Sequence, residues 1–195
     1  MSSVFYGCAV GGSTSHAPGT GPRELGSTPA PNATAPPETL RLIKSIDDPR
    51  NDVQPATPPY GDIVRLTIES GTLTGRFTVT LAGPAPDKLA KGEIVGIGID
   101  LGPPGAKDGT YQLFADGGER GWTAYLYTPR GFVRYPGTFV VAGERIAFSV
   151  SWSSIGGLRS GSVSAFCDWS KRGIAPIGMG SEDKVPDSGR PDYRS

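Results

Sequence analysis

The residues best suited to metal chemistry are the aspartates of one proline-rich stretch, "SIDDPRNDVQPATPPYGDI". Within sixteen positions it holds Asp47, Asp48, Asn51, Asp52 and Asp62. Hard cations such as calcium bind several carboxylate and carbonyl oxygens supplied by flexible loops. The spacing differs from that of an EF-hand loop, and aspartates that cap turns before a strand produce a similar pattern. The stretch therefore has two interpretations, a calcium site or a series of capped turns.

Two tyrosines are the candidates for contact with an organic ligand. In "GWTAYLYT", Tyr125 and Tyr127 fall on one face of a predicted strand and Trp122 falls on the other, because side chains alternate along a strand. If the Trp122 face is buried, the tyrosines point outward, where their rings can stack on sugars. Cross-strand packing of aromatic side chains on a sheet is the alternative explanation.

The side chains needed for nucleophilic catalysis are scarce. The single histidine, His16, lies in a Gly- and Pro-rich amino-terminal stretch, which excludes Ser-His-Asp and Cys-His catalysis from the folded part. A glycosidase needs two carboxylates about 5–10 Å apart across a cleft, and the sequence singles out no pair. The carboxylates near predicted strand ends are Glu69, Glu93, Asp100, Asp116, Glu119 and Glu144. A non-catalytic module is thus the preferred function, and an envelope enzyme acting on polysaccharide through a carboxylate pair is the alternative.

The charge balance argues against nucleic acid as a partner. Lys plus Arg and Asp plus Glu both total 19 among 195 residues, so the formal net charge is zero. Nucleic-acid binding depends on clustered cations that neutralise phosphates. The chain contains no block of like charge, and no apolar run approaches the ~20 residues that span a bilayer.

Composition divides the chain into three parts. Residues 1–38 are rich in Gly, Ser, Thr, Ala and Pro and contain almost no large apolar side chain after Tyr6, which is typical of a flexible tether. Residues 39–180 are predicted to form the folded domain. Residues 181–195, "SEDKVPDSGRPDYRS", are expected to be a polar tail that is only loosely attached.

Period-two patterning predicts an all-β domain. "DIVRLTIES" places Val64, Leu66 and Ile68 on one face, and "TLTGRFTVTLA" does the same for a run that begins with Leu73 and ends with Leu81. The same alternation recurs in "EIVGIGIDLG", "RIAFSVSW" and "SVSAFCDWS". About eight to ten short strands with frequent turns predict an antiparallel β-sandwich of jelly-roll or immunoglobulin-like type. Residues 39–48 are expected to be a short helix or the first strand, and 85–93 has room for one helical turn.

Gly7-Cys8-Ala9 and the tether behind it resemble the lipobox of bacterial lipoproteins, in which the cysteine receives a lipid. Phe5 and Tyr6 replace the Leu or Val and the small residue that lipoboxes prefer, and only seven residues precede Cys8. The hypothesis therefore includes a start further upstream. The alternative is an ordinary cysteine in a tail, bonded to Cys167, but Cys167 is predicted to be a small buried hydrophobe. If Cys8 is acylated, the protein is expected to be an extracytoplasmic lipoprotein anchored in the membrane. If it is not, a secreted protein is expected. In both cases cell-wall polysaccharide or an envelope protein is the expected further partner.

The segments "DDPRNDV…PPYGDIVRLTIESGTLTGRFTVT" and "EIVGIGIDLG" resemble the opening of DOMON-like and carbohydrate-binding-module family-nine-like domains. "EDKVPDSG" resembles their closing segment. The resemblance implies a two-sheet extracellular sandwich that binds sugar, haem or calcium or acts as a spacer. The haem-binding members use Met and His ligands, and the domain here has Met179 but no histidine. The calcium ligands that the resemblance implies are Asp48, Asp52 and Asp62.

Overall fold

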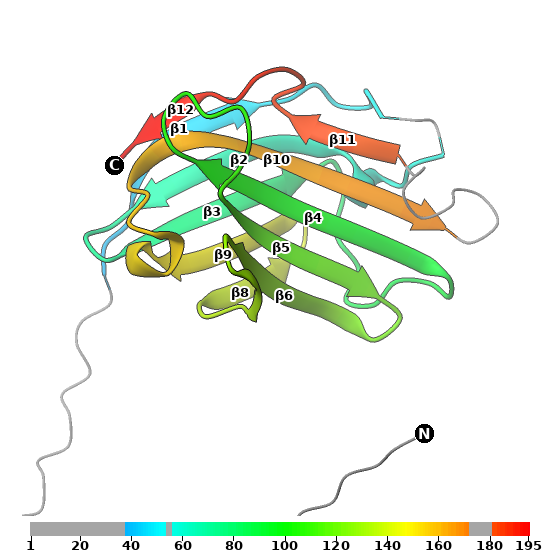
Figure 1. Ribbon diagram of the computed structural model, residues 1–195. Helices are drawn as coiled ribbons and strands as arrows, with labels where there is room; N and C mark the ends of the chain where they lie inside the picture. The colour runs from blue at the N-terminus through cyan, green and yellow to red at the C-terminus, as the bar shows by residue number, and fades with distance from the viewer. Residues whose placement is uncertain (1–37, 54–55, 172–180) are drawn as a thin grey trace, which may run out of the picture. The chain divides into compact units, whose positions relative to one another are not determined.

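Antiparallel strand pairing defines the architecture of the computed structural model (Figure 1). The structure describes residues 38–53, 56–171 and 181–195, and the predicted tether with Cys8 lies outside them. Two short 3-10 helices, η1 (Pro59–Gly61) and η2 (Trp152–Ile155), interrupt the strands. The strands are β1 (Arg41–Asp47), β2 (Ile63–Ser70), β3 (Thr74–Leu81), β4 (Glu93–Gly102), β5 (Tyr111–Gly118), β6 (Gly121–Thr128), β7 (Gly131–Arg134), β8 (Thr138–Ala142), β9 (Arg145–Ser151), β10 (Ser160–Lys171), β11 (Ser181–Val185) and β12 (Asp192–Arg194).

The strands form two sheets, which confirms the predicted all-β sandwich. One sheet has five strands in the order β1-β2-β3-β9-β8, and the other has seven, with β11-β10-β4-β5-β6-β7 in a row and β12 also paired to β10. Every strand pair is antiparallel. In the described residues, no helix is long and apolar enough to cross a bilayer.

The core lies between the two sheets and consists of the alternate residues that the sequence pattern predicts. Val95, Ile97, Ile99 and Leu101 of β4 are completely buried. They face Phe77, Phe148 and other side chains that the five-stranded sheet contributes to the same apolar cluster. Burying a large apolar side chain contributes about 1.5–3 kcal/mol to folding, so this alternation is the main source of the fold's stability.

Two expectations about individual residues are wrong for local reasons. Val64 is only partly buried, because the pairing of β2 with β3 shifts register between Ile63 and Arg65 and this bulge turns Ile63 into the core instead. Leu73 lies in the turn before β3 and is 72% exposed. Residues 39–48 contain strand β1. Residues 85–92 form a loop without a helical turn in which Leu89 is buried, and Glu93 begins β4.

The carboxyl-terminal residues 181–195 are part of the sandwich, not a loosely attached tail. β11 pairs with β10 from Ala165 to Trp169, and β12 pairs with the beginning of β10. Val185 is completely buried and Tyr193 is 4% exposed. The expectation was wrong because the segment, although mostly polar, contains these two apolar side chains. They anchor it in the core, and its main chain pairs with the otherwise free edge of β10.

Candidate functional site

Five aspartates from widely separated parts of the described chain come together in two overlapping groups. Carboxylate oxygens of Asp48, Asp52 and Asp187 lie within 4.8 Å of one another, and those of Asp52, Asp62 and Asp183 do the same. Asp62 and Asp183 are only 2% and 4% exposed, whereas Asp52 and Asp187 are exposed. Asp52 belongs to both groups and joins them. We call these five residues the aspartate cluster.

The loop between β1 and β2 brings its own main chain to the cluster. Asp48 directly follows β1, and its N–H donates to the carbonyl oxygen of Val64 at 3.0 Å. Asn51 has a left-handed backbone conformation (φ 63°), which asparagine tolerates better than most residues. Its N–H donates to Oδ2 of Asp62 at 2.8 Å. The turn at Asn51 therefore holds the Asp62 carboxylate from one side.

The 3-10 turn η1 positions Asp62. Asp62 follows η1 directly, and its carbonyl oxygen accepts the N–H of Ala82 at 2.8 Å. The residue before it, Gly61, is buried, and a Cβ there would lie 2.6 Å from Cγ2 of Thr57. Glycine is required for this close approach of the loop to the turn. The backbone around η1 thus fixes Asp62 at the start of β2.

β11 and the turn after it supply the other two aspartates. Oδ2 of Asp183 accepts the backbone N–H of Ile63, a contact between residues 120 positions apart. The completely buried Val185 anchors the strand, and Asp187 follows the Val185–Pro186 bond in the next turn. The cluster therefore joins the loop after β1 to the carboxyl-terminal strands.

The five carboxylates repel one another, and three of them, Asp48, Asp62 and Asp183, are partly or fully buried. Burial raises the pKa of Asp48 to about 7, and the carboxylates of Asp183, Asp187, Asp52 and Asp62 each add to this rise. Burial raises the pKa of Asp183 to about 6, and two neighbouring carboxylates add to this rise. Burial also raises the pKa of Asp52, although a hydrogen bond with its own backbone opposes the rise. Nearby negative charge and desolvation both favour the protonated forms.

Two oxygens of the cluster are buried without a hydrogen-bond partner in the described part of the chain, Oδ1 of Asp62 and Oδ2 of Asp48. An unpartnered buried polar atom costs about 1–3 kcal/mol, and more if it is charged. A divalent cation held by either group would reduce the repulsion among its carboxylates, and one in the second group would give the Asp62 carboxylate a further partner. The donors in both groups are all carboxylates, the ligands that calcium prefers, without the sulfur or imidazole typical of zinc sites. The cluster therefore fits a calcium ion.

The structure brings the three aspartates predicted as calcium ligands into this cluster, but not as one group. Asp52 lies with Asp48 in the first group and with Asp62 in the second. Sequence reasoning missed Asp183 and Asp187, because their segment was expected to be loosely attached. The available signal was the apolar Val185 between them, which indicates a buried strand position next to acidic residues.

The two candidate tyrosines face outward, as expected if the opposite face of β6 is buried. Leu126 between them is 2% exposed, and Nε1 of Trp122 donates to the carbonyl oxygen of Pro86 at 2.8 Å. Tyr127 is 37% exposed.

A phenylalanine of β7 joins the two tyrosines. Phe132 is 54% exposed, its ring lies against that of Tyr127, and its ring centroid lies 5.9 Å from that of Tyr125. The outward tyrosines are therefore part of an exposed aromatic group.

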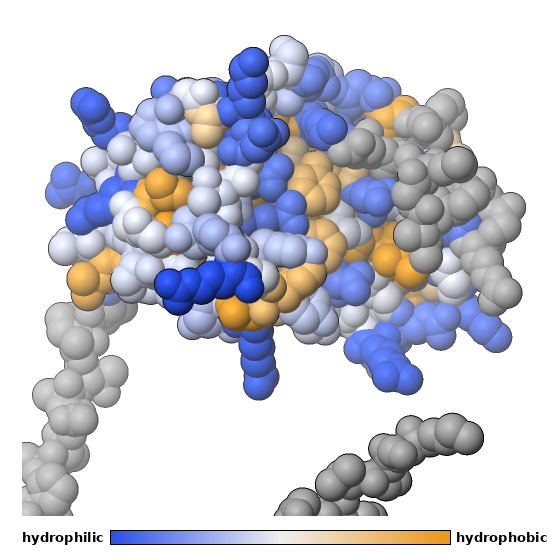
Figure 2. All heavy atoms as spheres, in the orientation of Figure 1, coloured by the Kyte–Doolittle hydropathy of each residue, from blue (hydrophilic) through white to orange (hydrophobic). Residues whose placement is uncertain are grey.

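This aromatic group continues across the outer face of the seven-stranded sheet. Strand register places Phe166 of β10, Gly98 of β4, Phe114 of β5 and Tyr125 of β6 in one cross-strand row. The rings of Phe114 and Phe166 are 6.4 Å apart, and Phe166 lies over Gly98. Figure 2 shows apolar side chains gathered in a band over the sheet nearest the viewer. We call these three aromatic residues, Phe114, Phe166 and Tyr125, together with the adjacent Tyr127 and Phe132, the aromatic row.

A hollow of about 570 Å³ lies on the other sheet, and one of about 790 Å³ lies beside β6, β7 and β8. Tyr125, Phe132 and Tyr135 help to line the second hollow. The hydroxyl of Tyr135 is itself buried and has no hydrogen-bond partner among the residues described. Aromatic rings are therefore the main feature of the second hollow's lining.

The carboxylates considered for catalysis are in part engaged by cations. Glu93 accepts a 2.9 Å hydrogen bond from Lys171 and one of 3.1 Å from the hydroxyl of Tyr60, and its pKa is lowered, first by Lys171. Arg190 lies 3.7 Å from Asp100. These ion pairs give Glu93 and Asp100 a structural role.

Cys167 is free and completely buried, as predicted for a small hydrophobe of the core. Burial raises the pKa of its thiol well above the usual value, so it is poorly suited to act as a nucleophile or metal ligand. Cys8 lies outside the described residues.

Comparisons with protein families, with curated proteins and with solved structures find no match for this chain. Any proposal about function therefore rests on the fold and on the geometry of the aspartate cluster, the aromatic row and the two hollows. The lipoprotein and DOMON-like resemblances remain predictions.

Proposed function

We propose that this chain is a non-catalytic binding module of the cell envelope, lipid-anchored or secreted, whose β-sandwich binds a calcium ion at the aspartate cluster. The observation that carries the calcium proposal is Oδ1 of Asp62, a carboxylate oxygen buried without a partner among the described residues and beside two further carboxylates. Calcium there would connect the loop after β1 to β11 and stabilise both.

Thermal unfolding of the full chain tests this proposal. The chelated protein is compared with the same protein in excess calcium and in excess magnesium. At a calcium concentration about a hundred times Kd, binding contributes about 2.7 kcal/mol, which raises Tm by roughly 5–10 °C for a domain of this size. Magnesium is expected to do less, because it demands octahedral geometry and keeps its water.

Asp62→Asn is the variant that tests the carrying observation. It keeps the size of the side chain and removes one ligand charge, so calcium affinity is expected to fall about tenfold or more. Asp87→Asn is the matched control, because Asp87 is an aspartate outside the cluster. An unchanged Tm in calcium, or an equal response of the two variants, would contradict the proposal.

Carbohydrate binding by the aromatic row is the second candidate function, favoured by the exposed rings of Tyr127 and Phe132 beside the aromatic-lined hollow. The test is retention on insoluble neutral polysaccharides. Replacing both rings by alanine is expected to abolish retention, whereas Leu73→Ala, which removes an exposed apolar side chain in a turn, leaves it unchanged. Retention that survives loss of both rings would exclude this surface.

The envelope location rests on Gly7-Cys8 and the tether, and it has its own test. Protein made from the upstream-extended gene should show the mass of a lipid on Cys8, and a Cys8→Ser variant should not. An unmodified Cys8 in that protein would disprove the lipid anchor while leaving the calcium proposal intact.

A further inference from the structure

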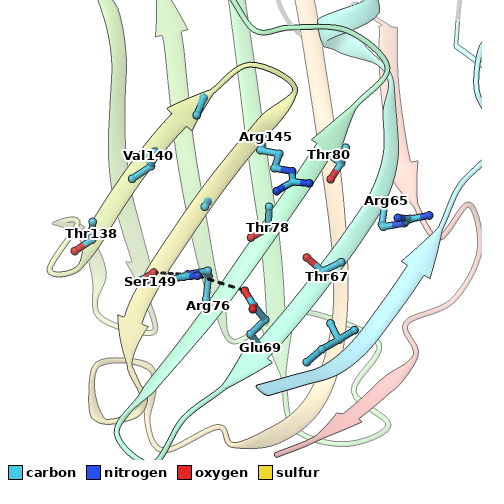
Figure 3. Close-up of a pocket in the computed structure, with 13 residues that line it drawn as sticks. Arg65, Thr67, Glu69, Arg76, Thr78, Thr80, Thr138, Val140, Arg145 and Ser149 are labelled. Carbon is cyan, nitrogen blue, oxygen red and sulfur yellow. Dashed lines mark hydrogen bonds and ion pairs between the residues drawn. The ribbon is translucent and has the colours of Figure 1, made fainter. Parts of the chain in front are cut away.

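The outer face of the five-stranded sheet is a polar surface that neither the calcium proposal nor the aromatic row uses. A hollow of about 570 Å³ lies on it, lined by outward side chains of β1, β2, β3, β8 and β9 (Figure 3). Its charged lining residues are three arginines and one glutamate. Asp47 on the same face pairs with Arg65 and reduces this excess to one positive charge, in a chain whose formal net charge is zero.

The floor of the hollow is a row of small side chains. Thr67 pairs with Thr78, and Thr78 pairs with Ala147 on the next strand. Val140 continues the row on the edge strand β8. Neighbouring strands lie about 4.8 Å apart, so a row across four strands is roughly 14 Å long. The small side chains leave a shallow trough that runs across the strands.

The neighbouring cross-strand row, on one side of this floor, contains two arginines. Arg65 pairs with Thr80, and Thr80 pairs with Arg145. Figure 3 shows Arg145 reaching over the sheet toward Thr80. Arg65 forms an ion pair with Asp47, and both side chains are more than half exposed. The side chain of Arg145 has no ion-pair or hydrogen-bond partner in the described part of the chain.

The row on the other side contains the third arginine. Arg76 lies 3.6 Å from Glu69, and its Nε donates to the hydroxyl of Ser149 at 3.4 Å. Both contacts are long, and the Arg76 side chain is 45% exposed. Exposed ion pairs of this kind are worth about 0–1 kcal/mol, so Arg76 can exchange Glu69 for a competing anion at little cost.

We propose that this hollow binds an acidic polysaccharide whose chain lies in the trough across the strands. Guanidinium groups bind carboxylates and sulfates through two parallel hydrogen bonds, and Arg145 and Arg76 stand on opposite sides of the floor to do so. Thr78 and Thr67 lie in the row between them and offer hydroxyls as hydrogen-bond partners for a sugar. Nucleic acid would need many more cations, and a lipid surface would need inserted apolar side chains.

The test measures binding of the full chain to soluble polysaccharides by affinity electrophoresis. Polygalacturonate carries carboxylates, dextran sulfate carries sulfates, and dextran carries no charge. A chelator is present throughout, so that calcium bridges between carboxylates do not contribute. We expect retardation by an acidic polymer and none by dextran, and the comparison of the first two identifies the anion.

Arg145→Gln and Arg76→Gln are the variants that assign the site. Each removes one exposed charge-assisted contact, so we expect affinity for the acidic polymer to fall about two- to fivefold in each variant. Arg120→Gln is the matched control, because Arg120 is an exposed arginine in the turn between β5 and β6. Thermal melting verifies that all three variants remain folded, as expected for exposed side chains.

Several results would overturn the inference. Equal retardation by dextran would show that charge is not recognised, and equal loss in all three variants would show that binding is diffuse. Loss of binding in the variant without the rings of Tyr127 and Phe132 would place the polymer on the aromatic row. Binding to anionic lipid vesicles without binding to acidic polymers would identify a membrane surface instead. Because the chelator removes calcium, failure of the calcium proposal leaves this test unaffected.

Discussion

Single residues show how closely this sandwich is packed on its outer faces as well as inside. Gly98 of β4 is buried beneath the ring of Phe166. Glycine weakens a strand, but an aromatic ring from the neighbouring strand can cover it and restore the lost packing. Two phenylalanines of the aromatic row, Phe114 and Phe166, are held in this way over Gly96 and Gly98. Gly96 and Gly98 of "EIVGIGIDLG" therefore leave the space into which these aromatic rings pack.

Gly98→Ala tests this role at the residue scale. A Cβ at Gly98 would lie 2.2 Å from Cε1 of Phe166, so the ring must move. We expect a loss of about 1–3 kcal/mol in the free energy of unfolding, measured by urea denaturation. Gly118→Ala is the control, because a Cβ at Gly118 has no atom within 4 Å. If both variants have the same stability, the ring does not depend on the glycine.

The carboxyl-terminal strands β11 and β12 pack against elements from much earlier in the chain. Asp183 of β11 contacts the start of β2, and the hydroxyl of Tyr193 in β12 donates to the carbonyl oxygen of Leu158 at 2.8 Å. The Tyr193 ring also lies edge-on to Phe77, with centroids 6.2 Å apart. β11 and β12 thus close the sandwich beside β10 and complete the aspartate cluster.

Tyr193→Ala tests the attachment of the last strand. Removing a large aromatic side chain that is 4% exposed is expected to cost about 3 kcal/mol or more. Tyr193→Phe, which loses only the hydrogen bond to Leu158, should cost about 1 kcal/mol. Arg194→Ala, at an exposed neighbour, is expected to be neutral in the same chemical denaturation. A neutral Tyr193→Ala would mean that residues 181–195 are attached loosely after all.

The elements differ in how far sequence could predict them. Alternation places Val95, Ile97 and Ile99 correctly because the apolar positions of β4 follow period two without interruption. It fails at Val64, since a bulge depends on how two strands pair and not on one strand's pattern. It also fails for β11, whose position depends on an edge of β10 that no local pattern indicates. The same limit hid Asp183 and Asp187 from the predicted site.

At the scale of the whole molecule, the two sheets present chemically different outer faces. The seven-stranded sheet carries the aromatic row, and the five-stranded sheet carries arginines and threonines. The sandwich interior is apolar apart from a few buried polar groups, among them Asp62 and Asp183 of the cluster. The two proposed binding surfaces therefore lie on opposite outer faces, and the proposed cation site lies where distant segments of the chain meet.

The raised pKa values of the aspartate cluster make the stability of the whole domain depend on pH. The pKa of Asp48 is raised from 3.8 to about 7, and that of Asp183 to about 6. Between pH 4 and pH 7 the folded state therefore binds more protons than the unfolded chain, and stability falls as pH rises through this window. Without calcium, we expect Tm to decrease from pH 5 to pH 8.

Calcium is expected to reverse this trend, because it replaces the protons that the cluster would otherwise bind. The stabilisation by calcium should be largest above pH 7 and should weaken as pH falls toward 5. Differential scanning calorimetry of chelated and calcium-loaded protein over this range measures both curves. Asp62→Asn should retain part of the pH dependence from Asp48 and Asp183 while losing about half or more of the calcium response. A calcium effect of equal size at pH 5 and pH 8 would show that the ion binds elsewhere than at these protonated carboxylates.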